Sequence, residues 1–563
     1  MPVRQALDRW GATLARAVAA VGSGVLLWVS FPPLEHSGAA WLALVPLILL
    51  TLVTPPRQAF AWGFLSGLVF WLATLVWFLR LTDSSGVPLA IVGLGWVALA
   101  AYCALYTGAF CAAVSFWRRA WGFGEIWRSV VYVFGIPVLW VGFEYLRYNL
   151  FGGFAWNAVG VSQFRSYPIL QIAEWGGAYL VSGVLLLLNA SLAVTAARYA
   201  KWPPFGQRYR PHPELFGALT VVCVCIVWGA GRCRAYTSVD GNALIATIQP
   251  NVTQVAKWTE EQASDTYEKL DTLTTEAMAF AEVFGKRRPD LVVWPETTTP
   301  DYVLESTQCL AFVTALAARG SPLLVGSVDY SGHAEDYQFY NNAVLFDTNG
   351  VVRDVYAKQH LVPFGEYIPM ESWIPLLKRL APLGWSCTPG TRSTVFHTGN
   401  GLLAFSSLIC FEDTVAGLSR CFVAQGARLL INQTNDAWFD NTIEARQHTS
   451  QFVFRCVENR VPAVRSANTG LTCFIDRNGR IYHGALQTEH GIAGASDGPA
   501  QALRPTYDVS WVAVPGDAMP LTFYTRYGDR FFALPCAVLA ALTLAVGLVA
   551  ERRRGDPGPG ADA

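Results

Sequence analysis

Long apolar stretches dominate this sequence and rule out a single water-soluble domain. A helix needs ~20 apolar residues to cross a bilayer, and eight stretches approach or exceed that length. Hydrophobic residues make up 53% of the 563 residues and charged residues only 15%, as in a protein partly embedded in lipid. The sequence therefore predicts a bundle of about eight transmembrane helices, at residues 15–31, 38–54, 59–79, 87–116, 129–147, 168–197, 213–231 and 531–550.

The basic residues between these stretches predict an orientation. Lys and Arg are concentrated on the cytoplasmic side of membrane proteins. If the N-terminus is cytoplasmic, the opposite side carries only Arg80, Arg147 and Arg165. We therefore expect both ends of the chain in the cytoplasm and the long segment after the seventh stretch on the other side. The basic residues then placed in the cytoplasm are Arg4, Arg9, Arg16, Arg57, Arg118, Arg119, Arg128, Arg198, Lys201, Arg208, Arg210, Arg552, Arg553 and Arg554.

The long segment between the seventh and eighth stretches has a different pattern. Short β-rich runs such as ALIATIQPN alternate with helical stretches, and the Asn-Gly pairs at 349–350 and 478–479 indicate hairpins. This alternation predicts an α/β domain with two sheets face to face and helices covering them. The expected organisation is seven transmembrane helices in 1–234, the α/β domain in 235–528, and the eighth helix with a cytoplasmic tail in 529–563.

Charge and cysteine usage narrow the classes of function. The formal net charge is zero, so no overall field attracts nucleic acid. The 12 cysteines form no CxxC pair and no Cys/His ligand spacing, so we expect neither a metal site nor a cofactor.

Three ionisable residues stand at the ends of predicted strands. Glu296 ends LVVWPE, Lys358 ends VVRDVYAK and Cys410 ends LLAFSSLIC. A thiol with a pKa near ~8.5 is mostly protonated at neutral pH, so a nucleophilic cysteine needs a base. A carboxylate can take that proton, and an ammonium can stabilise an oxyanion. Each residue alone also fits a structural role, as core filler, solvated lysine or turn residue.

Longer motifs around these residues carry a family resemblance. WPE at 294–296, YAKQHLVPFGEYIP at 356–369 and ICFED at 409–413 resemble the Glu-Lys-Cys signatures of the nitrilase superfamily. Together with the apolar stretches, nearly the whole chain resembles the apolipoprotein N-acyltransferase family, the membrane-embedded branch of that superfamily. The resemblance implies a nitrilase-like αββα sandwich in a multi-domain protein of the bacterial inner membrane, with the catalytic domain on the periplasmic side.

The resemblance also implies roles for individual residues. Glu296 matches the general base, Lys358 the oxyanion stabiliser and Cys410 the acylated nucleophile. Glu366, in PFGE, matches a second acid that supports the site, and Glu412, in CFE, matches a further acid beside the nucleophile.

Other positions are expected to meet the substrates. Trp258 and Phe411 match positions that line the site or the acyl path, and the family often has Tyr where this chain has Phe411. The stretch 371–387 combines apolar side chains with two cations, which indicates an arm resting on the membrane surface or, alternatively, a buried amphipathic helix. The residues in it that we expect to bind substrate are Trp373, Leu376 and Leu377.

The implied reaction has two steps. Cys410 takes a fatty acyl chain from a phosphatidylethanolamine-like phospholipid as a thioester, and the α-amine of a diacylglyceryl-cysteine apolipoprotein then takes it as an amide. Two alternatives stay open. One is a membrane-anchored amidase or nitrilase that hydrolyses small amides. The other is a non-catalytic lipid-binding scaffold or transporter, for which Glu144 and Glu174 are the intramembrane candidates.

Overall fold

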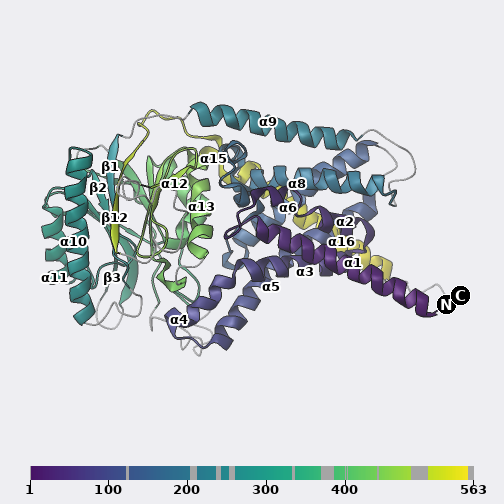
Figure 1. The fold of residues 1–563 in the computed structure, drawn as a ribbon, viewed down its shortest axis with the longest axis horizontal. Helices are drawn as coiled ribbons and strands as arrows, with labels where there is room; N and C mark the ends of the chain where they lie inside the picture. Colours follow the sequence, from purple (N-terminus) through teal and green to yellow (C-terminus); the bar gives the residue numbers. More distant parts are fainter. Residues whose placement is uncertain are drawn as a thin grey trace. The chain divides into compact units, whose positions relative to one another are not determined.

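A computed structural model describes most of the chain, which divides into two compact units. The helical unit comprises Met1–Val76, Gly93–Cys233 and Tyr527–Ala563, and the sheet unit comprises Trp77–Val92 and Arg234–Arg526. Figure 1 shows the elements of both. The domain boundaries expected from the sequence stay a prediction. The described residues are 2–121, 126–202, 212–235, 242–252, 260–332, 337–368, 386–399, 401, 403–439, 443–483 and 505–555.

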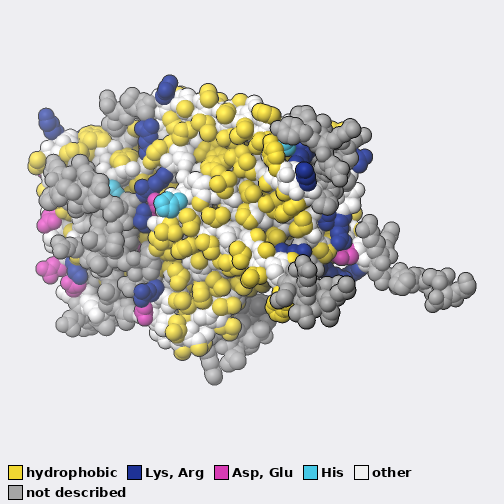
Figure 2. Space-filling model, turned by 45° about the vertical axis from the view of Figure 1, so that its right-hand side comes forward, with side chains coloured by type: hydrophobic (Ala, Val, Ile, Leu, Met, Phe, Trp, Pro, Cys, Tyr) yellow, Lys and Arg dark blue, Asp and Glu magenta, His cyan; other side chains and the backbone are white. Residues whose placement is uncertain are grey.

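Long apolar helices build the helical unit. Six helices among the described residues are long and apolar enough to cross a membrane, and a seventh is added if the pair Pro56–Thr74 and Val76–Ser85, bent by 48°, counts as one span. Hydrophobic side chains gather over a broad face of the molecule (Figure 2). The main helices are α1 (Pro2–Val29), α2 (Val45–Val53), α3 (Pro56–Thr74), α5 (Leu89–Trp121), α6 (Ile126–Asn149), α8 (Ala173–Tyr199), α9 (Pro213–Ala235) and α16 (Ala533–Gly555).

The apolar stretch 38–54, expected to be one transmembrane helix, does not form a single long helix. The stretch 38–54 forms a 3-10 helix at Ser37–Trp41 and then the nine-residue α2. At 1.5 Å per residue, α2 is well short of the hydrocarbon thickness of a bilayer. Pro46 lies at the start of α2, where a missing backbone N–H is tolerated, so the apolar run is split into two short helices.

Two glutamates inside the helical unit have partners there. Glu174 forms an ion pair with Arg232, 3.0 Å from Oε1 to Nη2. Glu144 Oε1 accepts a hydrogen bond of 2.7 Å from the backbone N–H of Val159. Both carboxylates therefore contribute to packing between elements of this unit.

The sheet unit is an αββα sandwich, as expected. One six-stranded sheet has the order β12-β1-β2-β3-β4-β5, and the other has the order β11-β10-β9-β8-β7-β6. Helices α10 (Glu260–Phe284) and α11 (Thr307–Ala317) cover the first sheet, while α12 (Ala416–Ala424) and α13 (Glu444–Asn459) lie on the side of the second (Figure 1). The strands are β1 (Ala243–Gln249), β2 (Leu291–Val293), β3 (Leu323–Ser331), β4 (Gln338–Phe346), β5 (Val352–Ala357), β6 (Phe396–His397), β7 (Ala404–Ile409), β8 (Leu429–Thr434), β9 (Ala463–Ala467), β10 (Cys473–Ile475), β11 (Ile481–Tyr482) and β12 (Thr506–Val512).

Each sheet contains the same parallel core. β1, β2 and β3 pair in parallel, with α10 and α11 in the crossovers, and β7, β8 and β9 repeat this arrangement with α12 and α13. Every residue of β1 and β8 is buried, as expected for parallel strands covered on both faces. The two Asn-Gly pairs expected in hairpins do lie there: Asn349-Gly350 connects β4 to β5, and Asn478-Gly479 connects β10 to β11.

The segment Trp77–Val92 belongs to the sheet unit although apolar stretches flank it in the sequence. Trp77 Nε1 donates a hydrogen bond of 3.1 Å to Gln447 Oε1 on α13, and the Trp77 ring packs edge-on against Phe439 at 4.7 Å. Ser84, on α4 (Leu81–Ser85), donates to the carbonyl oxygen of Trp438 at 2.7 Å. No sequence pattern predicted this docking.

The packing of the first sheet against its helices generates a stability prediction. Phe346 is fully buried in the core formed by that sheet with α10 and α11. Phe346→Ala should cost about 3 to 5 kcal/mol, because it removes buried apolar surface and leaves a cavity. The measurement is the melting temperature of the full-length protein in detergent. Val351→Ala, at a side chain that is 51% exposed, is the control and should melt like wild type. Equal melting temperatures for both variants would contradict this packing.

Candidate active site

Strand ends bring an acid and a lysine into contact. Lys358 follows β5 directly, and Glu296 lies three residues beyond β2 in the same sheet. Lys358 Nζ is 3.3 Å from Glu296 Oε1, and both side chains are buried. Cys410 follows β7, in the facing sheet. The structure therefore places these three sequence-predicted residues at the ends of strands whose sheets face each other.

A second carboxylate completes the surroundings of the lysine. Lys358 Nζ donates a hydrogen bond of 2.8 Å to Glu366 Oε1. Asn341 Nδ2 donates to Glu296 Oε1 and to Glu366 Oε1, at 2.9 Å each, and so ties the two acids together. Burial alone would lower the pKa of Lys358, but the carboxylates of Glu366 and Glu296 raise it well above its ordinary value. The ammonium therefore stays charged at neutral pH.

The nucleophile candidate is a protonated thiol at rest. Cys410 is half-buried, and burial together with the carboxylate of Glu296 raises the pKa of its thiol, although Lys358 opposes this. The backbone at Cys410 has φ of +51°, a left-handed conformation that residues with a side chain adopt at a cost. A thiol of this kind requires a base when it reacts, and Glu296 is the acid that acts on it most strongly.

Glu412 joins the chain segments that carry the lysine and the thiol. It is fully buried, and its Oε1 accepts hydrogen bonds from the backbone N–H groups of Gln359 (2.7 Å) and His360 (3.0 Å) and from the Tyr356 hydroxyl (2.9 Å). Its Oε2 accepts from the N–H of Ile409 at 2.8 Å. Burial raises the pKa of Glu412 to about 7, against the effect of these donors. Glu412 thus connects the residues after Lys358 to the residue before Cys410.

Comparison with known proteins places most of the chain in one family. Residues 23–191 match the model of the apolipoprotein N-acyltransferase N-terminal domain, and residues 244–496 match that of the carbon-nitrogen hydrolases. A protein of Geobacter metallireducens named apolipoprotein N-acyltransferase is 34% identical over 534 residues, covering 94% of each chain. The chain belongs to the apolipoprotein N-acyltransferase family.

Other relatives extend the comparison. A Brucella melitensis protein with the same name is 30% identical over 491 residues, covering 83% of this chain and 86% of its own. Among solved structures, a carbon-nitrogen hydrolase from Helicobacter pylori covers 52% of this chain and 94% of its own, with 14% identity and a TM-score of 0.33.

The remaining sequence-predicted residues of this N-acyltransferase fall into two groups. The ring of Phe411 stacks on His360, with centroids 6.1 Å apart. Burial, followed by the charge of Lys358, lowers the pKa of His360, so the imidazole is neutral at pH 7. The other substrate-binding candidates, and nearly all of the stretch 371–387, lie outside the described residues: Trp258, Trp373, Leu376 and Leu377.

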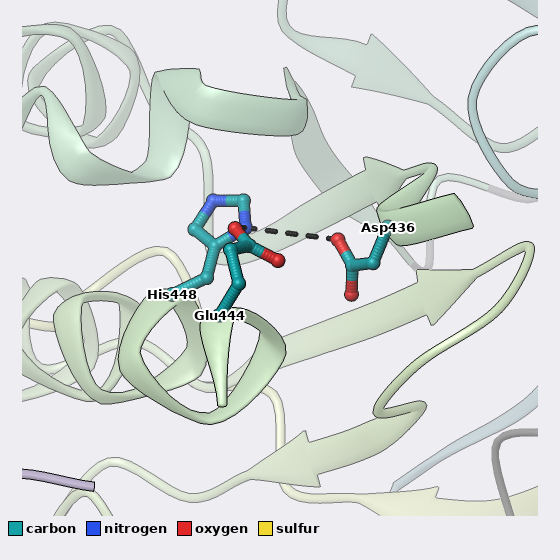
Figure 3. Close-up of side chains that lie close together, drawn as sticks. All are labelled: Asp436, Glu444 and His448. Atoms are coloured by element: carbon teal, nitrogen blue, oxygen red, sulfur yellow. Dashed lines mark ion pairs between the residues drawn. The ribbon is translucent and has the colours of Figure 1, made fainter. Parts of the chain in front are cut away.

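A buried charge cluster that the sequence did not reveal lies near the thiol. Asp436, Glu444 and His448 come together from the chain after β8 and from α13 (Figure 3). Their ligand atoms lie within 4.8 Å of one another, a spacing that a metal ion could use. Arg465 Nη2, however, donates to Asp436 Oδ1 (3.1 Å) and Oδ2 (2.9 Å) and lies 3.2 Å from His448 Nδ1. A guanidinium already supplies the positive charge, so the cluster is an ion-pair network.

Further charges balance this network. Asp413, three residues after Cys410, lies 2.7 Å from His448 Nε2 and 3.4 Å from Arg465 Nη1. Burial alone would lower the pKa of His448. The carboxylate of Asp413 nevertheless raises this pKa to about 10. Burial and the charge of Asp436 raise the pKa of Glu444 to about 8. At neutral pH His448 and Arg465 are therefore charged, whereas Glu444 is mostly protonated.

Glu444→Gln should flatten part of the pH dependence of stability. The unfolded chain releases this proton near pH ~4.3 and the folded chain near pH 8. The bound proton therefore stabilises the folded protein fully below pH ~4.3. This stabilisation decreases as the pH rises and is lost once the pH passes 8. Glutamine does not titrate, so the variant should lack this fall. The measurement is the melting temperature of both full-length proteins in detergent from pH 5 to 9; parallel curves would contradict the assignment.

Proposed function

We propose that Cys410 carries a fatty acyl group as a thioester from a phospholipid to the N-terminal amine of an apolipoprotein. As a member of its family, the chain N-acylates lipoproteins, and the proposal assigns the residues and the acyl donor. The observation that carries it is the buried Lys358 ammonium, held between Glu296 and Glu366 beside a protonated thiol.

The first step forms the thioester. Glu296 accepts the proton of the Cys410 thiol, and the sulfur attacks the ester carbonyl carbon of the phospholipid, at its sn-1 chain. Lys358 stabilises the oxyanion of the tetrahedral intermediate. The ester C–O bond then breaks, and Glu296 returns the proton to the departing alcohol of the lysophospholipid. The sulfur–acyl bond is the only new bond retained on the enzyme.

The second step transfers the acyl chain. The α-amine of the diacylglyceryl-cysteine attacks the thioester carbonyl and loses a proton to Glu296. The C–S bond breaks, and the proton restores the thiol of Cys410 while an amide is released. Lys358 must stay charged while the attacking amine must be neutral, and the two carboxylates beside Lys358 account for that difference.

Membrane embedding follows from the substrates. Moving an acyl chain into water costs ~0.8 kcal/mol per methylene, or roughly 10 kcal/mol and more for a chain of about sixteen carbons. Both lipid substrates therefore reach the site from the bilayer and not through water. The resemblance favours a phosphatidylethanolamine-like donor.

Intact-mass spectrometry tests the thioester. Purified wild-type protein incubated with phosphatidylethanolamine vesicles should gain one fatty acyl group that hydroxylamine removes. Cys410→Ala should gain none and should lose N-acylation of an apolipoprotein. Glu296→Gln should slow N-acylation by roughly 10²-fold to 10⁴-fold, the usual loss with a general base.

A matched control separates this result from general damage. Cys421→Ala removes another partly exposed cysteine, on α12, and should keep both the adduct and the activity. N-acylation by Cys410→Ala at the wild-type rate would reject the thioester mechanism. Hydrolysis of small amides without transfer from phospholipid would favour the amidase alternative instead.

We also propose that the sheet unit faces the periplasm of a bacterial inner-membrane protein. Val283, at the end of α10, is 82% exposed, and Lys201, after α8, is exposed in a segment expected to be cytoplasmic. A membrane-impermeant maleimide should label Val283→Cys in cells whose outer membrane is permeabilised. Lys201→Cys should be labelled only after the inner membrane is opened. Labelling in the reverse order would contradict the orientation.

A further inference from the structure

A buried asparagine binds the backbone of the nucleophile. Asn432 lies on β8, which pairs in parallel with β7, and is fully buried. Its Nδ2 donates to the carbonyl oxygen of Cys410 at 2.9 Å and to that of Leu408 at 3.0 Å. The left-handed conformation of Cys410 costs free energy, so it persists only where its surroundings stabilise it. The Asn432 amide is such a contact.

Arg465 fixes which way this amide points. An asparagine side chain can present either its oxygen or its NH₂ group to a neighbour. Arg465 Nη1 donates to Asn432 Oδ1 at 2.5 Å, so the NH₂ group must face the two carbonyl oxygens. Arg465 is fully buried and is itself held by Leu471, whose carbonyl oxygen accepts from Nε at 3.1 Å, and by Asp436.

Because the peptide bond is planar, the hydrogen bond from Asn432 to the Cys410 carbonyl also fixes the direction of the next N–H group. In a trans peptide the N–H points to the side opposite the preceding C=O. When Asn432 holds the carbonyl of Cys410, the N–H of Phe411 therefore points in the opposite direction within that peptide plane. The same contact limits rotation about the backbone of Cys410, from which the thiol projects.

We propose that Asn432, oriented by Arg465, is the positioning residue that sets the directions of the Cys410 thiol and of the Phe411 N–H for attack on the acyl carbonyl. The charge cluster of Asp413, Asp436, Glu444, His448 and Arg465 thereby acts on the reaction without contacting substrate. The inference rests on the proposed role of Cys410 as nucleophile.

Asn432→Asp tests the inference with almost no change in shape. The carboxylate can still accept from Arg465, but it cannot donate to the carbonyl oxygens of Leu408 and Cys410. We expect kcat for N-acylation and the single-turnover rate of thioester formation to fall by about 10-fold to 100-fold, the loss that slight misplacement of reacting groups causes. KM for phospholipid and apolipoprotein should not change, because Asn432 contacts neither.

Asn478→Asp is the matched control. Asn478 is also buried and accepts from a buried arginine, Arg460 Nη1 at 3.4 Å, but it lies on the turn between β10 and β11, away from Cys410. This variant should keep the wild-type kcat. Wild-type kcat in folded Asn432→Asp, or an equal loss in both variants, would overturn the inference. Activity in Cys410→Ala would instead reject the proposed function, so the two failures are distinguishable.

Arg465→Lys provides a second route to the same answer. Lysine keeps the positive charge beside Asp413 and Asp436 but lacks the planar set of donors that also reaches Asn432 and Leu471. Its kcat should fall with KM unchanged, and the double variant with Asn432→Asp should lose less than the product of the two separate losses. Strictly multiplicative losses would show that the two residues act independently and would overturn their assignment to one chain of contacts.

Discussion

The ammonium of Lys358, buried between two carboxylates, is the interaction on which the site depends. Removing one partner of a buried ion pair costs roughly 3 to 5 kcal/mol, because it leaves an uncompensated charge without water. Lys358, Glu296 and Glu366 therefore stabilise one another, and Asn341 binds both acids. In the proposed mechanism, the same arrangement provides a fixed positive charge for an oxyanion. The same three side chains thus stabilise the interior and, in the proposed mechanism, assist acyl transfer.

The two sheets place these groups by a simple repetition. Each contains three parallel strands with two crossover helices, and the proposed catalytic residues follow strands of both sheets. The acid and the lysine come from one sheet and the thiol from the other. Glu412 then connects the two segments through backbone N–H groups at Gln359, His360 and Ile409. Hydrogen bonds from backbone N–H groups to the Glu412 carboxylate therefore hold together the segments that carry the lysine and the thiol.

Local patterns predicted much of the fold and the central residues. The Asn-Gly hairpins and the buried strands have periodic or turn signals within a few residues, and Glu296, Lys358, Glu366 and Cys410 lie in recognisable motifs. The charge cluster as a whole has no such signal, although Asp413 lies in the ICFED motif. Asp413, Asp436, His448 and Arg465 are spread over four elements, and single charged residues in a sequence look like solvated ones. Apolar content also failed to show that α2 is only nine residues long.

The segment Trp77–Val92 has a consequence for dividing this protein. A fragment beginning near residue 235 would contain every strand of the two sheets, yet it would lack Trp77 and Ser84. The ring of Phe439 and the amide of Gln447 would then lose their contacts with Trp77. Phe439 lies in the same short helix as Asp436, which binds Arg465. Expressing residues from about 235 onward alone therefore deletes part of the sheet unit. A truncated form of this unit should be fused to the segment Trp77–Val92.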